Sequence, residues 1–178
     1  TLRKKTLMKA LVRHRYGSPA ALAVEEIDIP TPGDDQVLIR VLAASVNPLD
    51  WHALTGTPWL TRLVEGIGRP KQPVLGRDVA GTVTAVGAKV TQLAVGDEVF
   101  GGADGSLAEF VLGRPRSLAH RPVNVDVVAA AATPIAGLTA LQALRDKGRL
   151  QAGQSVLVNG AAGGVGTFAV QLAVAMGA

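Results

Sequence analysis

Cysteine is absent from this chain of 178 residues, and aromatic residues make up only 3% of it. Without cysteine, disulfides, thiolate nucleophiles and cysteine zinc ligands are all excluded. Such a chain is compatible with the cytoplasm, which is the location we expect. The scarcity of aromatic residues means that the core must be built from Val, Leu, Ile and Ala. Charged residues are also few, at 18%, and this balance is too apolar for a disordered chain.

The charges do not form a nucleic-acid-binding pattern. The formal net charge is +4, and the basic residues are scattered apart from a denser stretch between Arg62 and Arg77. That stretch also contains Glu65, prolines and glycines, whereas nucleic-acid readers usually interleave basic residues with aromatic ones. We therefore predict a solvated loop there, with contacts to the phosphates of a nucleotide cofactor as the alternative.

A long uncharged segment, residues 151–178, could be mistaken for a membrane span. It contains six glycines together with Asn159 and interior glutamines. A span needs about 20 predominantly apolar residues, so this composition argues against one. We expect neither a membrane nor a nucleic acid as a partner.

The first two thirds of the chain show short β segments separated by turns. Alternating and β-branched residues predict strands at 9–12, 22–27, 36–46, 78–86 and 107–112. The pairs Gly96-Asp97 and Gly101-Gly102 are typical of turns, and a short helix is expected around Trp51, His52 and Leu54. Many short strands at this spacing predict a barrel-like β domain over residues 8–123.

The pattern changes to α/β over residues 124–178, which we expect to form a second domain. Residues 125–144 are alanine-rich and interrupted by Pro134 and Gly137, which predicts two helical pieces meeting at a bend. Residues 155–159 predict a short buried strand of the parallel-sheet type. A helix is expected over 164–176, with one apolar face. The members of that face are Val165, Phe168, Ala169, Leu172 and Met176.

A glycine-rich turn lies between this expected strand and helix. Ala161, Gly163 and Gly166 occupy the three marked positions of a G-x-G-x-x-G pattern, with alanine at the first. Such a turn brings backbone amides close to a pyrophosphate, and the helix N-terminus adds free N–H groups and a positive dipole end. Strand, turn and helix in this order favour dinucleotide binding over a flexible loop.

The residue that would read the ribose of a dinucleotide is not found. It should lie about 20 residues beyond the turn, and no Asp or Glu occurs after Asp146. The motif alone therefore does not choose between NAD and NADP.

Five motifs in order resemble the medium-chain dehydrogenase/reductase superfamily and, within it, the zinc-free quinone oxidoreductases. They are Val-Asn-Pro-Leu-Asp at 46–50, Leu-Gly-Arg-Asp-Val-Ala-Gly at 75–81, Val-Gly-Asp-Glu-Val-Phe at 95–100, Ala-Gly-Leu-Thr-Ala at 136–140, and Gly-Gln-Ser-Val-Leu-Val at 153–158 leading into the glycine-rich turn. The resemblance covers nearly the whole chain from Met8.

The resemblance implies a GroES-like β domain followed by the first strand and helix of a Rossmann domain. It also implies hydride transfer from NADPH to a quinone or conjugated carbonyl compound. Zinc-dependent relatives carry a cysteine near Asn47 and a His-Glu pair where this chain has Arg77-Asp78. No metal site is therefore expected, and hydrogen bonds would have to stabilise the charge that develops on the acceptor.

The resemblance also implies roles for particular residues. Asn47 and Thr139 would contact the nicotinamide or the substrate, and Asn47 and Asp50 are the catalytic candidates. The pyrophosphate would be held by the glycine-rich turn, Gly160, Ala161, Ala162, Gly163, Gly164, Val165 and Gly166.

Each of these side chains also has a purely structural explanation. Asn47 could serve the turn before Pro48, and the Thr139 hydroxyl could bond back to a carbonyl of its own helix. Asp50 or His52 could relay a proton, but a helix cap for Asp50 and an exposed surface position for His52 are simpler explanations. Arg77 and Asp78 could pair with each other or with solvent.

Two other functions remain open at this level. One is reduction of 2-enoyl thioesters, and the other is a non-catalytic binding or structural role for a shortened relative. The strand at 155–159 has few candidate neighbours, and unpaired edges and bare apolar faces favour association. We therefore expect a homo-oligomer that associates through residues 155–178, or poor order in that segment.

Overall fold

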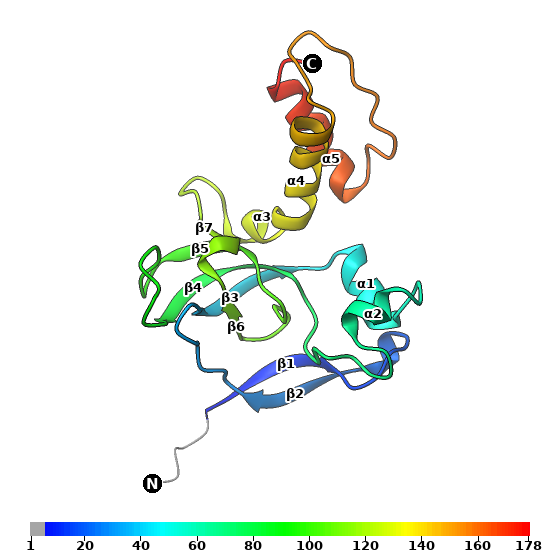
Figure 1. Cartoon of the computed structure of the whole chain (residues 1–178). Coiled ribbons are helices and arrows are strands. Elements are labelled where there is room, and N and C mark those ends of the chain that lie inside the picture. The colour runs from blue at the N-terminus through cyan, green and yellow to red at the C-terminus, as the bar shows by residue number, and fades with distance from the viewer. Residues whose placement is uncertain (1–5) are drawn as a thin grey trace. The chain divides into compact units, whose positions relative to one another are not determined.

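The structure is a computed structural model that describes residues 6–178, and it divides into two compact units (Figure 1). The first unit ends at Ala132 and the second begins at Thr133. The division falls later than the boundary expected after residue 123, because helix α3 (Val127–Ala131) packs on strands β3 and β4 of the first unit.

The first unit is built on two antiparallel sheets. Strands β1 (Leu7–Arg13) and β2 (Leu22–Asp28) form one of them. The other has the order β6-β3-β4-β5-β7. Its strands are β3 (Val37–Ser45), β4 (Asp78–Val86), β5 (Glu98–Gly102), β6 (Phe110–Gly113) and β7 (Leu118–His120). The predicted combination of a β domain with a helical second part is confirmed.

The main core lies on one face of the larger sheet. Val37 and Ile39 of β3, Val79 and Val83 of β4, and Val99 of β5 are at most 1% exposed. These residues alternate along their strands, as a half-buried sheet requires. The core is aliphatic, as the scarcity of aromatic residues predicted.

Strand β1 is joined to other parts of the unit by backbone hydrogen bonds. The Leu11 amide donates to the Leu107 carbonyl at 2.8 Å, and the Arg13 amide donates to the Pro73 carbonyl at 2.9 Å. β1 is therefore hydrogen-bonded both to the segment before β4 and to the segment before β6, which fits the expected barrel-like arrangement.

Strands β5 and β7 were not predicted, and the turn expected at Gly101-Gly102 is wrong. Gly101 instead pairs with Leu118 of β7 inside the sheet. A Cβ atom at Gly101 would lie 2.2 Å from the Ser117 carbonyl oxygen, and the backbone φ there is +152°. Glycine is needed because the two backbones approach closely, not because the chain turns.

Short helices fill the connections of the first unit. Helix α1 (Pro48–Thr55) confirms the helix expected around Trp51. Helix α2 (Thr61–Glu65) lies in the basic stretch for which a solvated loop was predicted, so that prediction is wrong in part. Two single-turn segments, η1 (Pro19–Ala21) and η2 (Pro115–Ser117), each begin with a proline.

The second unit contains α4 (Pro134–Leu141), the π-helical segment η3 (Gln142–Lys147) and α5 (Gly164–Ala175). Two helical pieces, α3 and α4, confirm the expected break, with Pro134 as the first residue of α4. Helix α5 packs on α4. Its buried residues are Gly166, Ala169 and Ala173, whereas Val165 is 40% exposed, so the predicted face was wrong in including Val165.

The strand predicted at 155–159 does not form. No strand is assigned to these residues, and Leu157 is 95% exposed. A strand needs a neighbour for its N–H and C=O groups. Among the residues that the structure describes, none pairs with this segment, because every assigned strand lies in the first unit.

Candidate functional site

A buried polar cluster forms where β3 ends and β4 begins. Ser45 and Asp78 are paired across these strands, and Asp78 is completely buried. The Ser45 hydroxyl donates to Asp78 Oδ2 at 2.9 Å, and Asn47 Nδ2 donates to the same oxygen at 3.0 Å. Asp78 thus fixes the side chain of Asn47. The neighbouring Arg77 binds Glu65 and Asp104.

Asp50 is both a helix cap and a buried acid. Its Oδ2 accepts a hydrogen bond from the Asn47 amide at 2.8 Å, at the start of α1. This confirms the capping explanation. The side chain is nevertheless only 4% exposed, and its Oδ1 has no partner at normal hydrogen-bond distance within residues 6–178.

Burial raises the pKa of the Asp50 carboxyl, because removal from water disfavours the charged form. The Asn47 amide and the nearby Arg77 guanidinium favour the carboxylate, but burial outweighs them. Asp50 therefore holds its proton more tightly than an exposed aspartate does. A carboxyl group of this kind is suited to donating a proton.

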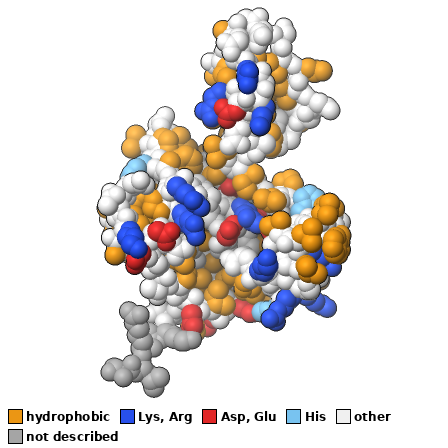
Figure 2. Space-filling model, viewed as in Figure 1, with side chains coloured by type: hydrophobic (Ala, Val, Ile, Leu, Met, Phe, Trp, Pro, Cys, Tyr) orange, Lys and Arg blue, Asp and Glu red, His pale blue; other side chains and the backbone are white. Residues whose placement is uncertain are grey.

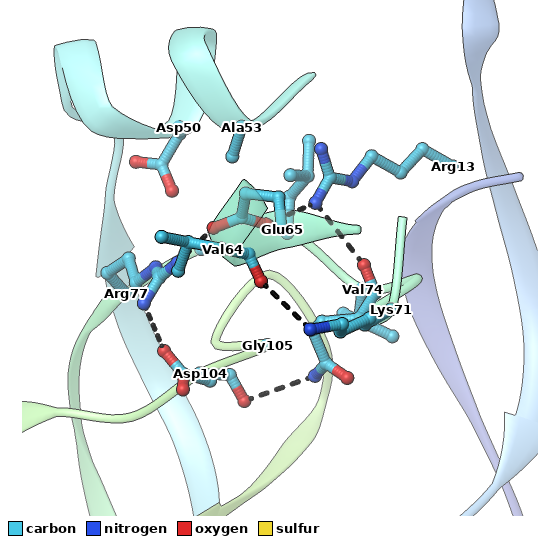
Figure 3. Close-up of a pocket in the computed structure, with 13 residues that line it drawn as sticks. Arg13, Asp50, Ala53, Val64, Glu65, Lys71, Val74, Arg77, Asp104 and Gly105 are labelled. Carbon is cyan, nitrogen blue, oxygen red and sulfur yellow. Dashed lines mark hydrogen bonds and ion pairs between the residues drawn. The ribbon is translucent and has the colours of Figure 1, made fainter. Parts of the chain in front are cut away.

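Asp50 borders a pocket of about 190 Å³ that also contains Arg13, Glu65, Arg77 and Asp104 (Figure 3). Glu65 joins two arginines, with Oε2 2.8 Å from Arg13 Nη2 and Oε1 2.7 Å from Arg77 Nη2. Arg77 Nη1 lies 2.7 Å from Asp104 Oδ1. Together these side chains form a network of ion pairs that extends from β1 to the loop after β5.

The innermost residues of this ion-pair network are almost inaccessible to water. Arg13 is 1% exposed and Glu65 is 9% exposed. Arg13 Nε and Nη1 have no hydrogen-bond partner within residues 6–178, and its guanidinium carbon lies 5.6 Å from the centre of the Tyr16 ring. This cluster could not be predicted from the sequence, because its members come from four separated segments. The only available signal was one acid, Glu65, within a basic stretch.

His52 takes no part in the pocket. It is exposed, and its Nδ1 lies 2.5 Å from the Thr57 carbonyl oxygen, to which it donates. The surface explanation for His52 therefore agrees with the structure.

The glycine-rich turn belongs to the second unit and leads directly into α5. Gly163 is the N-cap, and its amide donates to the Gly160 carbonyl at 3.0 Å. A Cβ atom at Gly166 would lie 2.2 Å from the Gly160 carbonyl oxygen and 2.7 Å from Ala161 Cα. Only glycine allows the first turn of the helix to approach the loop this closely.

The turn is accessible enough for the pyrophosphate of a dinucleotide to reach its backbone amides. Residues 160–165 are exposed, and the first amides of a helix have no partner within the helix. The helix dipole also favours an anion at this end. Of the residues predicted to hold the pyrophosphate, Gly160, Ala161, Ala162 and Gly163 lie in the turn, and Gly164, Val165 and Gly166 form the first turn of α5.

Thr139 lies on α4, in the same unit as the glycine-rich turn. It is exposed, and its hydroxyl donates to the Ile135 carbonyl at 2.6 Å. The back-bonding explanation therefore describes its present contact. The structure places Asn47 and Asp50 together in the first unit, and Thr139 and the turn in the second.

No metal centre is visible among residues 6–178, where no group of three or more His, Cys, Asp or Glu side chains could hold an ion. Within the same residues, no helix is both long and apolar enough to cross a membrane.

The fold and these motifs define a class of protein. The family model described as "Alcohol dehydrogenase GroES-like domain" matches residues 33–123, and this chain belongs to that family. The match lies entirely within the first unit.

Individual relatives place the chain among the quinone oxidoreductase-like members of the medium-chain dehydrogenase/reductase superfamily. It is 40% identical to the chloroplast envelope quinone oxidoreductase homolog of Arabidopsis thaliana, over 94% of this chain and 52% of that protein. It is 38% identical to the NADPH-dependent alkenal/one oxidoreductase of the same plant, over 93% of this chain and 44% of that protein.

Solved structures agree with this placement. The quinone oxidoreductase from Coxiella burnetii superposes with a TM-score of 0.87 at 33% identity, covering 97% of this chain and 55% of that one. The CurK enoyl reductase gives a TM-score of 0.88 at 31% identity, covering 96% and 52%. The chain thus spans about half the length of the proteins that it matches.

Proposed function

We propose that the protein containing this chain transfers hydride from NADPH to a quinone or conjugated carbonyl compound, without zinc. The observation that carries the proposal is the exposed segment 160–165, closed by the buried Gly166 in the first turn of α5. The names of the relatives support the choice of acceptor and of NADPH over NAD.

The second unit would hold the cofactor. The amides of Ala162, Gly163, Gly164 and Val165 would donate hydrogen bonds to the pyrophosphate, supported by the positive end of α5, and the Gly163 amide would then have to leave the Gly160 carbonyl. When bound, NADPH supplies a hydride for the acceptor. Thr139 would contact the nicotinamide or the substrate, and its hydroxyl would then have to leave the Ile135 carbonyl.

The first unit would handle the acceptor and the proton. Asn47 is positioned by Asp78 and Ser45, so its amide group is held in one place. Reduction of a carbonyl or quinone leaves negative charge on oxygen, which must be protonated to complete the reaction. Asp50, whose pKa burial raises, is the residue that we propose for this step.

The enoyl thioester reductase alternative has its own support. The CurK enoyl reductase matches the chain as closely in fold as the quinone oxidoreductase does. Both reactions deliver hydride to an activated double bond, so the acceptor alone separates them.

Steady-state oxidation of NADPH tests the proposal. With a simple quinone we expect turnover, and with a primary alcohol and NADP⁺ we expect none, because oxidation of an unactivated alcohol needs a metal such as zinc to polarise it. Faster turnover with a crotonyl thioester than with the quinone would favour the alternative. Alcohol oxidation without quinone reduction, or stoichiometric zinc in the purified protein, would contradict the proposal. The cytoplasmic location and the homo-oligomer remain predictions.

A further inference from the structure

The surface around α2 carries five large apolar side chains that point into solvent. Trp59, Leu60, Leu63, Val64 and Ile67, here named the α2 patch, are 58, 66, 52, 76 and 65% exposed. Figure 2 shows hydrophobic side chains gathered over the region of α1 and α2. Contiguous apolar surface of this kind usually marks an interaction site.

The helical segment at the α2 patch is amphipathic, but its apolar face is exposed to solvent and its charged face points toward the protein. Its apolar residues recur at three- and four-residue spacing, as on one helix face. The face toward the protein carries charge instead. Arg62 lies 4.6 Å from the centre of the Tyr16 ring, and Glu65 binds Arg13 and Arg77. A surface helix normally buries its apolar face, so this arrangement requires another explanation.

The inward charges prevent the segment from rolling over to hide its apolar face. Such a rotation would separate Glu65 from two arginines, one of them only 1% exposed. It would also remove Arg62 from Tyr16 and from the Gly56 carbonyl, to which Arg62 Nε donates at 3.2 Å. The fold therefore holds the apolar face outward.

Within residues 51–71, the exposed lysine and arginine charges beside the α2 patch are not balanced by an exposed carboxylate. Between residues 51 and 71 the only carboxylate is Glu65, which is buried. Arg69 and Lys71 are exposed, and the Lys71 amide donates to the Glu65 carbonyl at 2.7 Å. Lys71 Nζ lies 3.4 Å from the carbonyl oxygen of Val64, to which it donates, so the Lys71 ammonium lies at the edge of the α2 patch. Apolar side chains bordered by cations match an anionic surface.

We propose that the α2 patch binds the surface of an anionic lipid bilayer. Trp59 would lie at the level of the headgroups, where tryptophan is enriched, with the aliphatic side chains below it. Arg69 and Lys71 would face the lipid phosphates. The protein would lie on the membrane and not span it. The sequence expectation of no membrane partner was based only on the absence of a spanning segment.

Two other occupants fit less well. A second copy of the chain on a two-fold axis would contribute the same surface, so the interface would contain the positive charges of Arg69 and Lys71 from both copies. A small ligand needs a concave site, and of the five side chains only Val64 lines the described pocket.

Tryptophan fluorescence tests the proposal directly. The chain has two tryptophans: Trp59 in the α2 patch, and Trp51 on α1, which contacts α2. With vesicles of phosphatidylcholine mixed with phosphatidylglycerol, we expect a blue shift of the emission and co-sedimentation of the 178-residue protein. Phosphatidylcholine alone should give neither, and added salt should weaken binding. No cofactor is needed, so the outcome is separate from the proposed reaction.

Variants sharpen the test. Leu63→Ser with Val64→Ser should weaken partitioning at least about tenfold, because two apolar side chains no longer enter the lipid. Lys71→Gln should weaken it about fivefold. Val123→Ser changes a 99% exposed valine elsewhere in the first unit and should have no effect.

Three results would overturn the proposal. They are an unchanged emission with anionic vesicles, equal binding to both kinds of vesicle, and a lipid-free dimer in sedimentation velocity that Leu63→Ser with Val64→Ser dissociates. The dimer would assign the α2 patch to a second copy of the chain.

Discussion

Strand β4 and residues 155–159 have similar apolar sequences but different structures. β4 lies between β3 and β5, and its Val79 and Val83 are at most 1% exposed. In residues 155–159 Leu157 is 95% exposed, and no strand forms. The difference lies in the neighbours and not in the residues, since a strand is stabilised by cross-strand pairs more than by intrinsic propensity. The first unit is therefore organised by pairing, and the second by the packing of α5 on α4.

The largest expected effect comes from the buried ion cluster that ties the first unit together. Glu65→Ala leaves Arg13 buried without a counter-ion, and we expect a loss of about 3–5 kcal/mol in the free energy of unfolding. Urea unfolding followed by tryptophan fluorescence measures it, because both tryptophans lie in this unit.

Lys89→Ala is the matched control, since it breaks the pair between Lys89 and Asp34, whose side chains are 74% and 63% exposed. It should cost no more than about 1 kcal/mol. Equal losses in the two variants would show that burial of the Glu65 cluster is not what matters.

A second prediction compares the two regions by shortening one side chain in each of them to alanine. Ile39→Ala removes a completely buried side chain from the sheet and should cost about 2–5 kcal/mol. Leu157→Ala removes a 95% exposed one and should change the free energy of unfolding by less than about 0.5 kcal/mol. The second variant is followed by far-ultraviolet circular dichroism of the helices. A large loss from Leu157→Ala would mean that residues 155–159 are buried, by a partner strand or a second copy.

The smallest expected effect is a pH dependence due to Asp50. The folded-state pKa of this carboxyl lies above its unfolded value, so Asp50 contributes stability below the unfolded pKa. That contribution is lost as the pH rises through the folded-state pKa. Asp50→Asn should remove this part of the pH dependence. The measurement is the free energy of unfolding of both proteins as a function of pH. If the two curves superimpose, the pKa of Asp50 is not raised.

The sequence predicted the elements whose patterns are local. Alternating residues predicted strands β3 and β4. The Asn47-Pro48 pair predicted the start of helix α1, and Pro134 predicted the break between α3 and α4. The glycine-rich turn and the helix cap at Asp50 were also predicted from residues that are close in sequence.

What the sequence did not predict depends on contacts between distant residues. β5 ends in Gly101 and Gly102, which are typical of a turn until the approach of Ser117 is known. The ion cluster joins residues 13, 65, 77 and 104. Helix α2 reverses the usual rule that the apolar face is buried, so its periodicity could not indicate which face points inward.

Titration with NADPH tests the central claim, that the turn at 160–166 holds a dinucleotide. The unmodified protein should bind saturably. Gly166→Val places side-chain atoms on the Gly160 carbonyl and should weaken binding at least about tenfold through lost pyrophosphate hydrogen bonds. Gly68→Ala, where a Cβ atom meets nothing within 4 Å, should bind as the unmodified protein does. No binding by the unmodified protein, or equal binding by Gly166→Val, would contradict the claim.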